Sequence, residues 1–215
     1  MIISIDGPAA SGKSTTAKLL SKKLGYIHLN SGLLFRAITY VFIKNNLFDS
    51  LDLIVNDFIR QNTINLGGPT LSTVLWNGKN ITKYLNHEDI NRNINLISNN
   101  SVIREYLIDK QRSISLNKNI VCEGRDIGTV VFPNADYKFF LIASVESRVN
   151  RRYVEFSKKN INISKKEIKA NLISRDKNDI ERLVSPLIKA DDAIEIDTTN
   201  MSIVEQVNKI YNKIR

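Results

Sequence analysis

The sequence has little of what stabilises small secreted or fibrous proteins. Its 215 residues include one cysteine, Cys122, with only 4 prolines and 9 glycines. A single cysteine cannot form a disulfide within the chain, and the apolar Ile120 and Val121 beside it favour a buried thiol in a reducing compartment. The low proline and glycine content also excludes the collagen-like and disordered classes.

Long hydrophobic runs are missing as well. No apolar stretch approaches the roughly 18 to 20 residues of a membrane span, and residues 1–14 lack the basic-then-apolar pattern of a signal sequence. With 42% hydrophobic and 25% charged residues, the composition is that of an ordinary globular protein. We therefore expect a cytoplasmic protein without a membrane partner.

Acidic residues are outnumbered by basic ones, 22 to 31, which gives a formal net charge of +9. This charge fits a nucleic-acid surface, a small anionic substrate, or lysine enrichment without a functional meaning. A surface for single-stranded nucleic acid would interleave aromatic and basic residues. The single tryptophan and the scattered tyrosines do not form that pattern, so we expect no nucleic-acid partner.

The order of apolar runs and periodic segments predicts an α/β fold. Runs that predict short strands cover residues 1–5, 26–29, 120–122, 137–143 and 193–196, and helical periodicity covers 14–24, 33–42 and 203–214. Ser202 and Glu205 have the spacing of a capping box at the start of the last helix. Strands that alternate with helices form parallel sheets, and such sheets bind ligands at the carboxyl ends of their strands.

Residues 63–84 interrupt this alternation. Gly67-Gly68-Pro69 and Asn77-Gly78 are turn sequences flanked by short apolar segments, as in antiparallel hairpins. We interpret this segment as a small inserted subdomain that continues through a polar helical stretch to about residue 112. Residues 147–182 are rich in lysine, arginine and asparagine and predict helices at the surface.

The strongest motif lies between the first strand and the first helix. Residues 7–14 read GPAASGKS, which is the pattern of a phosphate-binding loop. Glycines let backbone N–H groups converge on phosphate oxygens, Lys13 reaches the β and γ phosphates, and the Ser14 hydroxyl binds Mg²⁺. The predicted ATP-binding residues are Gly7, Pro8, Ala9, Ala10, Ser11, Gly12, Lys13, Ser14 and Thr15.

A phosphate loop leaves the phosphoryl acceptor open: water, a protein or a small molecule. Transfer between two anionic substrates needs fixed positive groups, because the two sets of phosphates repel each other. Arginine suits this task because its guanidinium is always charged and binds oxygens in a bidentate manner. The candidate arginines are Arg36, Arg104, Arg125, Arg148, Arg151, Arg152, Arg175 and Arg182.

Several further segments together with the loop resemble the bacterial cytidylate kinase family, and the resemblance covers essentially the whole chain. Beyond residues 5–14, it is carried by Ser31-Gly32-Leu33-Leu34-Phe35-Arg36 and above all by residues 123–135, EGRDIGTVVFPNA. It continues in Lys138–Leu141, Arg148–Arg152, Arg175–Arg182, Ser185-Pro186-Leu187 and Asp192–Thr199. Gly124 to Pro133 is the most specific part, because many other nucleotide enzymes share the phosphate loop.

The resemblance implies the fold of a P-loop nucleoside monophosphate kinase. The expected core has a parallel sheet and covers about residues 1–62, 113–147 and 183–215. A monophosphate-binding insert covers about residues 63–112, and a helical lid covers about 148–182. The implied reaction transfers the γ-phosphoryl group of ATP, bound with Mg²⁺, to CMP or dCMP in pyrimidine metabolism, and we expect a monomer.

The same resemblance implies a role for each candidate residue. Lys13, Arg125, Arg148, Arg152 and Arg182 are the expected catalytic residues, with Ser14 at the metal. The expected CMP-binding residues are Ser31, Arg36, Asn95, Arg104, Arg125, Asp126, Arg175, Asp179 and Arg182. Within this set, Arg36, Arg125 and Arg182 bind the acceptor phosphate, Arg104 and Asp126 read cytosine, and Arg175 and Asp179 lie near the ribose.

Three positions depart from the pattern of the family: Asn30 in place of aspartate, Asn95 in place of serine, and Ser101 in place of proline. Two alternatives stay open at this point. One is a small kinase for a different acceptor, which would lack the segment Gly124–Thr129. The other is a nucleic-acid-binding P-loop protein or a GTP-dependent switch, although Asn117-Lys118-Asn119-Ile120 fails the guanine signature Asn-Lys-x-Asp at its last position.

Overall fold

The computed structural model describes residues 1–68 and 70–214, which form two compact units. The first unit contains residues 1–26 and 119–215, and the second contains residues 27–118. Pro69, in one of the predicted turns, and Arg215, at the end of the predicted core, lie outside the described residues. None of the helices in the described ranges has the length and apolarity needed to cross a membrane.

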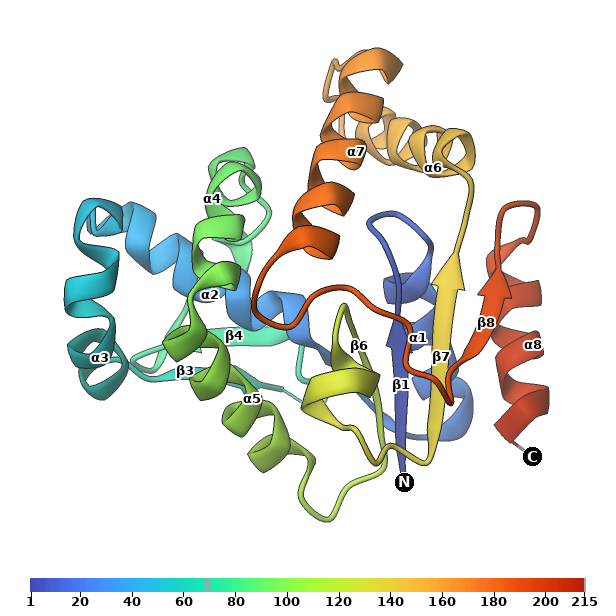
Figure 1. Cartoon of the computed structure of the whole chain (residues 1–215), viewed down its shortest axis with the longest axis horizontal. Helices are drawn as coiled ribbons and strands as arrows, with labels where there is room; N and C mark the ends of the chain where they lie inside the picture. Colours follow the sequence, from blue (N-terminus) through green and yellow to red (C-terminus); the bar gives the residue numbers. More distant parts are fainter. Residues whose placement is uncertain (69, 215) are drawn as a thin grey trace. The chain divides into compact units, whose positions relative to one another are not determined.

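A parallel sheet organises the first unit (Figure 1). Its strands are β1 (Ile2–Asp6), β6 (Ile120–Gly124), β7 (Tyr137–Ile142) and β8 (Ile194–Asp197), in the order β6-β1-β7-β8. Parallel strands are covered on both faces, which explains their nearly continuous apolar sequences. The α/β fold with a parallel central sheet is therefore confirmed.

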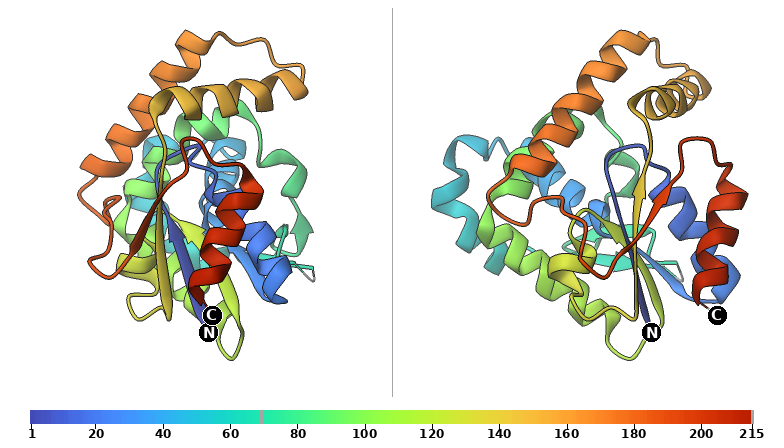
Figure 2. Two further views of the ribbon diagram at one scale, coloured as in Figure 1. Left: turned by 90° about the vertical axis from the view of Figure 1, so that its right-hand side faces the viewer. Right: turned by 45° about the vertical axis from the view of Figure 1, so that its right-hand side comes forward.

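Helices α1 (Lys13–Leu24) and α8 (Ile203–Ile214) lie side by side in this unit (Figures 1 and 2). Ile3 and Ile5 of β1, Leu20 of α1 and Ile210 of α8 are buried in one apolar cluster. The predicted capping box at the start of α8 is present, because Ser202 N–H donates to Glu205 Oε2 and Glu205 N–H donates to Ser202 Oγ. Cys122 is buried, as expected.

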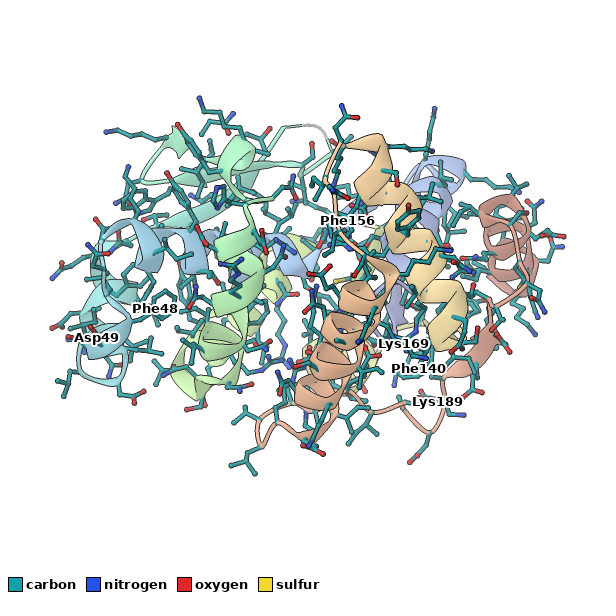
Figure 3. The ribbon with its side chains drawn as sticks, turned by 90° about the horizontal axis from the view of Figure 1, so that it is seen from above. Phe48, Asp49, Phe140, Phe156, Lys169 and Lys189 are labelled. Carbon is teal, nitrogen blue, oxygen red and sulfur yellow. The ribbon has the colours of Figure 1, made fainter. Side chains whose placement is uncertain are left out.

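Helices α6 (Val145–Lys158) and α7 (Lys165–Glu181) follow β7. Val149 of α6 and Ile168 and Leu172 of α7 are buried in a small apolar cluster that also includes Ala9 of the phosphate loop. Phe156 packs against this cluster, and Figure 3 shows it on α6, with Lys169 on α7. The two helices therefore share an apolar contact with the loop.

The second unit combines helices with a small antiparallel sheet. Its elements are β2 (Ile27–Asn30), α2 (Ser31–Lys44), η1 (Phe48–Ser50), α3 (Leu51–Gln61), β3 (Ile64–Gly67), β4 (Thr73–Trp76), β5 (Lys79–Asn80), η2 (Thr82–Tyr84), α4 (Glu88–Asn99) and α5 (Ser101–Ser115). Strands β3, β4 and β5 are antiparallel, as the turn sequences predict. Asn77 and Gly78 have positive φ angles of 47° and 78°, which suit the tight turn between β4 and β5.

Gly7 is required at the start of the phosphate loop for two reasons. Its φ of 148° is rarely adopted by residues with a side chain, and a Cβ at this position would lie 2.2 Å from the carbonyl oxygen of Leu141 on β7. That oxygen belongs to the backbone and cannot rotate away. Gly25, which ends α1, also has a positive φ of 71°, but a Cβ there would meet nothing within 4 Å.

We therefore predict that Gly7→Ala lowers the free energy of unfolding by about 3 kcal/mol or more, since backbone strain and a steric clash combine. The matched control Gly25→Ala should cost only about 1 kcal/mol, because it adds strain without a clash. Urea unfolding of both variants and the parent measures this difference. Equal losses would show that Gly7 does not need the close approach to β7.

Candidate active site

The phosphate loop joins β1 to α1, as the sequence predicts. Ala10 and Gly12 have positive φ angles of 59° and 95°. Residues that alternate between right-handed and left-handed conformations turn successive N–H groups toward one concave side, where an anion binds. The N-terminus of α1 follows directly and adds the positive end of its dipole. The loop thus has the local backbone of an anion site.

Lys13 is held inside this loop. The residue is 6% exposed, and its Nζ donates to the carbonyl oxygen of Pro8 at 2.8 Å. Burial, followed by the positive charge of Arg125, lowers the pKa of Lys13 to about 7, against the opposing effect of Glu123. A phosphate beside Nζ would favour the charged form, so anion binding and protonation of Lys13 are coupled.

The pairing of β1 with β6 places a second functional side chain, Glu123, beside the loop. The register places Asp6 next to Gly124, so the two strands end together. Ser14 Oγ donates to Glu123 Oε2 at 2.6 Å. A hydroxyl and a carboxylate are oxygen ligands of the kind that hard divalent cations prefer. The residues present therefore fit a magnesium ion that arrives with a nucleotide.

Asp6 connects the end of β1 to the segment that follows β6. Its carboxylate accepts the N–H groups of Ile127 at 2.9 Å and Gly128 at 2.8 Å, at the start of the π-helical turn η3 (Ile127–Val131). Burial raises the pKa of Asp6 to about 6, although both N–H groups oppose the shift. Above that pH the carboxylate is ionised, and it fixes the turn that directly follows Asp126.

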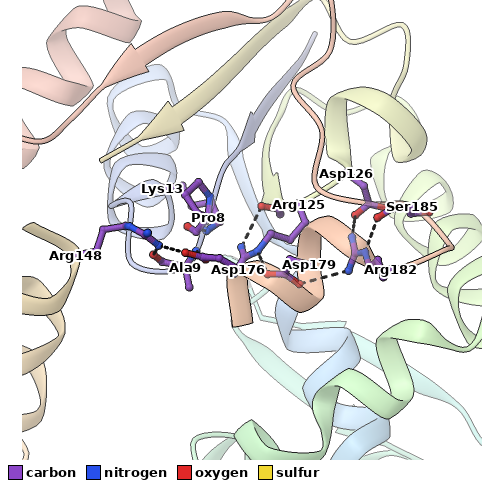
Figure 4. Close-up of polar contacts among 11 residues, drawn as sticks. Pro8, Ala9, Lys13, Arg125, Asp126, Arg148, Asp176, Asp179, Arg182 and Ser185 are labelled. Atoms are coloured by element: carbon purple, nitrogen blue, oxygen red, sulfur yellow. Dashed lines mark hydrogen bonds and ion pairs between the residues drawn. The ribbon is translucent and has the colours of Figure 1, made fainter. Parts of the chain in front are cut away.

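Acidic and basic side chains alternate along one network in the first unit (Figure 4). Arg125 Nε donates to Asp179 Oδ2 at 2.6 Å, and Arg182 lies 3.7 Å from carboxylate oxygens of both Asp126 and Asp179. Burial would lower the pKa of Arg125, but the carboxylates of Asp179, Glu123 and Asp176 together raise it. Burial would likewise raise the pKa of Asp179, but Arg125, Arg182 and Arg175 hold it below its ordinary value.

A second network reaches the phosphate loop from α6 and α7. Arg148 Nη1 donates to the Ala9 carbonyl oxygen at 3.1 Å and forms an ion pair with Asp176. Asp176 Oδ1 in turn accepts the N–H of Ala9 at 3.2 Å. Both polar groups of the Ala9 backbone are thus bound by side chains from these helices.

The remaining two arginines of α6 differ in their contacts. Arg151 donates to the carbonyl oxygen of Ser11 at 3.2 Å and to Thr198 Oγ1 at 3.1 Å, which attaches α6 to the loop. Arg152 pairs with Glu155 and lies over the ring of Phe156, with 4.8 Å between Cζ and the ring centroid. The contacts of Arg152 are therefore with its own helix, while Arg148 and Arg151 contact the phosphate loop.

The second unit presents two fixed arginines. Arg36 of α2 donates to the Leu85 carbonyl oxygen at 2.9 Å and to Asn91 Oδ1 at 2.7 Å. Arg104 of α5 is buried and donates to the Ser98 carbonyl oxygen at 2.9 Å. Its guanidinium lies over the ring of Phe35, with 5.2 Å between Cζ and the ring centroid. Ser31 begins α2 and is buried, and Asn95 on α4 is half-buried.

Comparisons with known proteins agree on one family. The sequence model described as Cytidylate kinase matches residues 3–215. The chain belongs to the cytidylate kinase family. It is similar to proteins named Cytidylate kinase from Fusobacterium nucleatum (41% identity, covering 100% of this chain and 97% of the relative) and Bacillus velezensis (40% identity, covering 97% and 93%).

A solved structure shares the fold. An uncharacterized protein from Eubacterium ventriosum aligns with a TM-score of 0.53 at 12% identity, covering 100% of this chain and 98% of that one. At this level of identity the likeness concerns the fold alone. Membership of the cytidylate kinase family, in contrast, is shown by sequence over the full chain.

Three residues without a role predicted from the sequence contact candidate site residues in the structure. Glu123 accepts a hydrogen bond from Ser14, and Asn91 accepts one from Arg36. Asp176 accepts hydrogen bonds from Arg148 and from the Ala9 backbone. Glu123 and Asp176 lie within segments that carry the family resemblance, which is a usable signal. Asn91 shares one helical face with Asn95, four residues away, which is a weaker signal.

The lowered pKa of Lys13 predicts that nucleotide binding takes up a proton. A bound phosphate raises the pKa back toward its ordinary value, so uptake by Lys13 should be about 0.5 proton at pH 7 and about 0.9 at pH 8. ATP affinity should accordingly fall as the pH rises above about 7.

Titration calorimetry in buffers of different ionisation enthalpy measures this uptake. Lys13→Met removes the titrating amine and serves as the reference for proton uptake by the other groups. The same proton uptake in parent and variant would contradict the lowered pKa of Lys13.

Proposed function

We propose that this chain transfers the γ-phosphoryl group of ATP to CMP or dCMP, giving ADP and CDP or dCDP. One observation carries the proposal: in a member of the cytidylate kinase family, the phosphate loop and the segment Glu123-Gly124-Arg125-Asp126 meet at the ends of two paired strands. The first is suited to the donor phosphates and the second to the acceptor. Their proximity is what direct transfer between two nucleotides requires.

On the donor side, Lys13 and the backbone N–H groups of residues 7–14 would bind the phosphates of ATP. Ser14 and Glu123 would hold Mg²⁺ that arrives with the nucleotide, because the hydrogen bond between them already places their two oxygens side by side. When bound, this ion offsets the negative charge of the β and γ phosphates. Lys13 supplies a second positive charge at the group that is transferred.

On the acceptor side, Arg36, Arg125 and Arg182 would bind the phosphate of CMP. Asp126 and Arg104 would read the base: a carboxylate accepts the N4 amino group of cytosine, and a guanidinium donates to N3 and O2. Uracil would place a carbonyl oxygen against the carboxylate, which disfavours it. Arg175 and Asp179 would lie near the ribose, Asn95 would help to hold the base, and Ser31 is a further proposed CMP-binding residue.

Catalysis would consist of positioning and charge stabilisation. The acceptor phosphate oxygen is already anionic at neutral pH, so no side chain needs to act as a nucleophile. Arg148 and Arg152 of the helical lid would stabilise charge on the transferred group and help to exclude water. The contact of Arg148 with the loop supports its role, and Arg152 would need a different rotamer to take part.

The division into core (1–62, 113–147 and 183–215), insert (63–112) and lid (148–182) stays a prediction. So do the monomeric state, the cytoplasmic location and the place in pyrimidine metabolism. They do not affect the assignment of the site residues.

The proposed activity predicts a clear order of acceptors. With Mg-ATP and a coupled assay of ADP release, CMP and dCMP should support turnover at least tenfold above UMP and AMP, because uracil lacks an amino group for Asp126 and adenine is a larger, bicyclic base. Turnover on UMP or AMP instead would overturn the acceptor assignment. ADP release without any acceptor, at the rate seen with CMP, would contradict a kinase reaction.

An Asp126→Asn variant tests the source of this selectivity. It keeps the size of the side chain but removes the negative charge that favours an amino group, so kcat/KM should fall for CMP by about tenfold or more and change little for UMP. Equal losses for both acceptors would mean that Asp126 acts through the acceptor phosphate, for instance through its ion pair with Arg182.

A further inference from the structure

A closed ring of polar contacts surrounds one residue of the phosphate loop (Figure 4). The N–H of Ala9 donates to Asp176, Asp176 pairs with Arg148, and Arg148 donates to the carbonyl oxygen of Ala9. Asp176 uses its two oxygens for two different partners: Oδ1 accepts from the backbone and Oδ2 accepts from the guanidinium. A neutral side chain of this size would lose the charge that holds Arg148.

The ring joins segments that are distant in the sequence. Asp176 is 167 residues from Ala9, and Arg148 is 28 residues from Asp176. Ile168 and Leu172, on the preceding turns of α7, are buried in the apolar cluster that includes Ala9. Asp176 is therefore the polar end of the contact by which α7 reaches the loop, and its side chain is still 15% exposed.

Residues that the proposed function needs lie on the same helix as Asp176 or directly after it. Arg175 and Asp179 are on α7, and Arg182 follows its last residue. The contact between α7 and Ala9 therefore also fixes the backbone positions of these three residues. Arg148, at 6% side-chain exposure, depends on Asp176 for the compensation of its buried charge.

We propose that Asp176 is a positioning residue that latches α7 and Arg148 onto the phosphate loop and so keeps water away from the transferred phosphoryl group. The inference rests on the proposed function. Without the latch, a water oxygen attacks the γ-phosphorus, the bond from that phosphorus to the bridging oxygen breaks, and ADP, inorganic phosphate and a proton are released. With the latch closed, the CMP phosphate is the nucleophile that reaches the γ-phosphorus.

Asp176→Asn tests the latch through the partition of phosphoryl groups between CMP and water. With both substrates present, we expect the ratio of inorganic phosphate to CDP to rise about tenfold, the usual effect of losing one charge-assisted contact. This ratio is informative because unfolded protein forms neither product. A loss of stability alone would lower both products and leave the ratio unchanged.

Glu181→Gln is the matched control. Glu181 lies at the end of the same helix, is exposed, and pairs with Lys177 at 3.9 Å, so its substitution removes the same charge from α7 without touching the ring. Its ratio should equal that of the parent protein. The proposal is overturned if Asp176→Asn and Glu181→Gln give the same ratio.

A second measurement does not depend on activity or on the variant being stable. Hydrogen exchange in the nucleotide-free parent should show slow exchange of the Ala9 amide, because Asp176 accepts its hydrogen. Fast exchange of this amide would overturn the latch. Absence of CDP with the parent would instead refute the proposed function, while the exchange result would still stand for the latch.

Discussion

The parallel pairing of β1 with β6 is the contact on which the site depends. It brings Asp6 and Gly124 to the same sheet edge, so the loop that follows β1 and the arginine and aspartate that follow β6 begin side by side. Asp6 strengthens this junction by accepting two N–H groups of the turn after Asp126. The phosphate loop and the segment that we propose to read the base are thereby built on one sheet edge, which is the geometry that transfer between two bound nucleotides requires.

Charge compensation is the second constraint on this site. Many positive groups must converge on phosphates, yet a buried arginine without an anion destabilises the fold. The chain meets both demands by pairing Arg125 with Asp179, Arg148 with Asp176, and Arg182 with Asp126 and Asp179. Lys13 differs, because burial lowers its pKa and its neutral form becomes accessible near neutral pH. When substrates bind, their phosphates can then compensate these positive charges in place of the carboxylates.

The sequence predicted the features that depend on local pattern. The phosphate loop, the strands, the turn at Asn77 and the capping box at Ser202 follow from residues close together in the chain. Contacts over long sequence separations were not predictable in this way: Ser14 with Glu123, and Ala9 with Asp176, are 109 and 167 residues apart. The partner of Arg152 was also missed, because an arginine at helical spacing from Glu155 can point along the helix or into the site.

In the proposed reaction, the γ-phosphoryl group passes directly from ATP to the phosphate of CMP. Incubation with ATP labelled at its γ-phosphorus, followed by separation of the nucleotides, tests this claim most directly. The label should appear as the terminal phosphate of CDP while the ATP is converted to ADP in equal amount. Label that accumulates as inorganic phosphate, with CMP left unchanged, would contradict it.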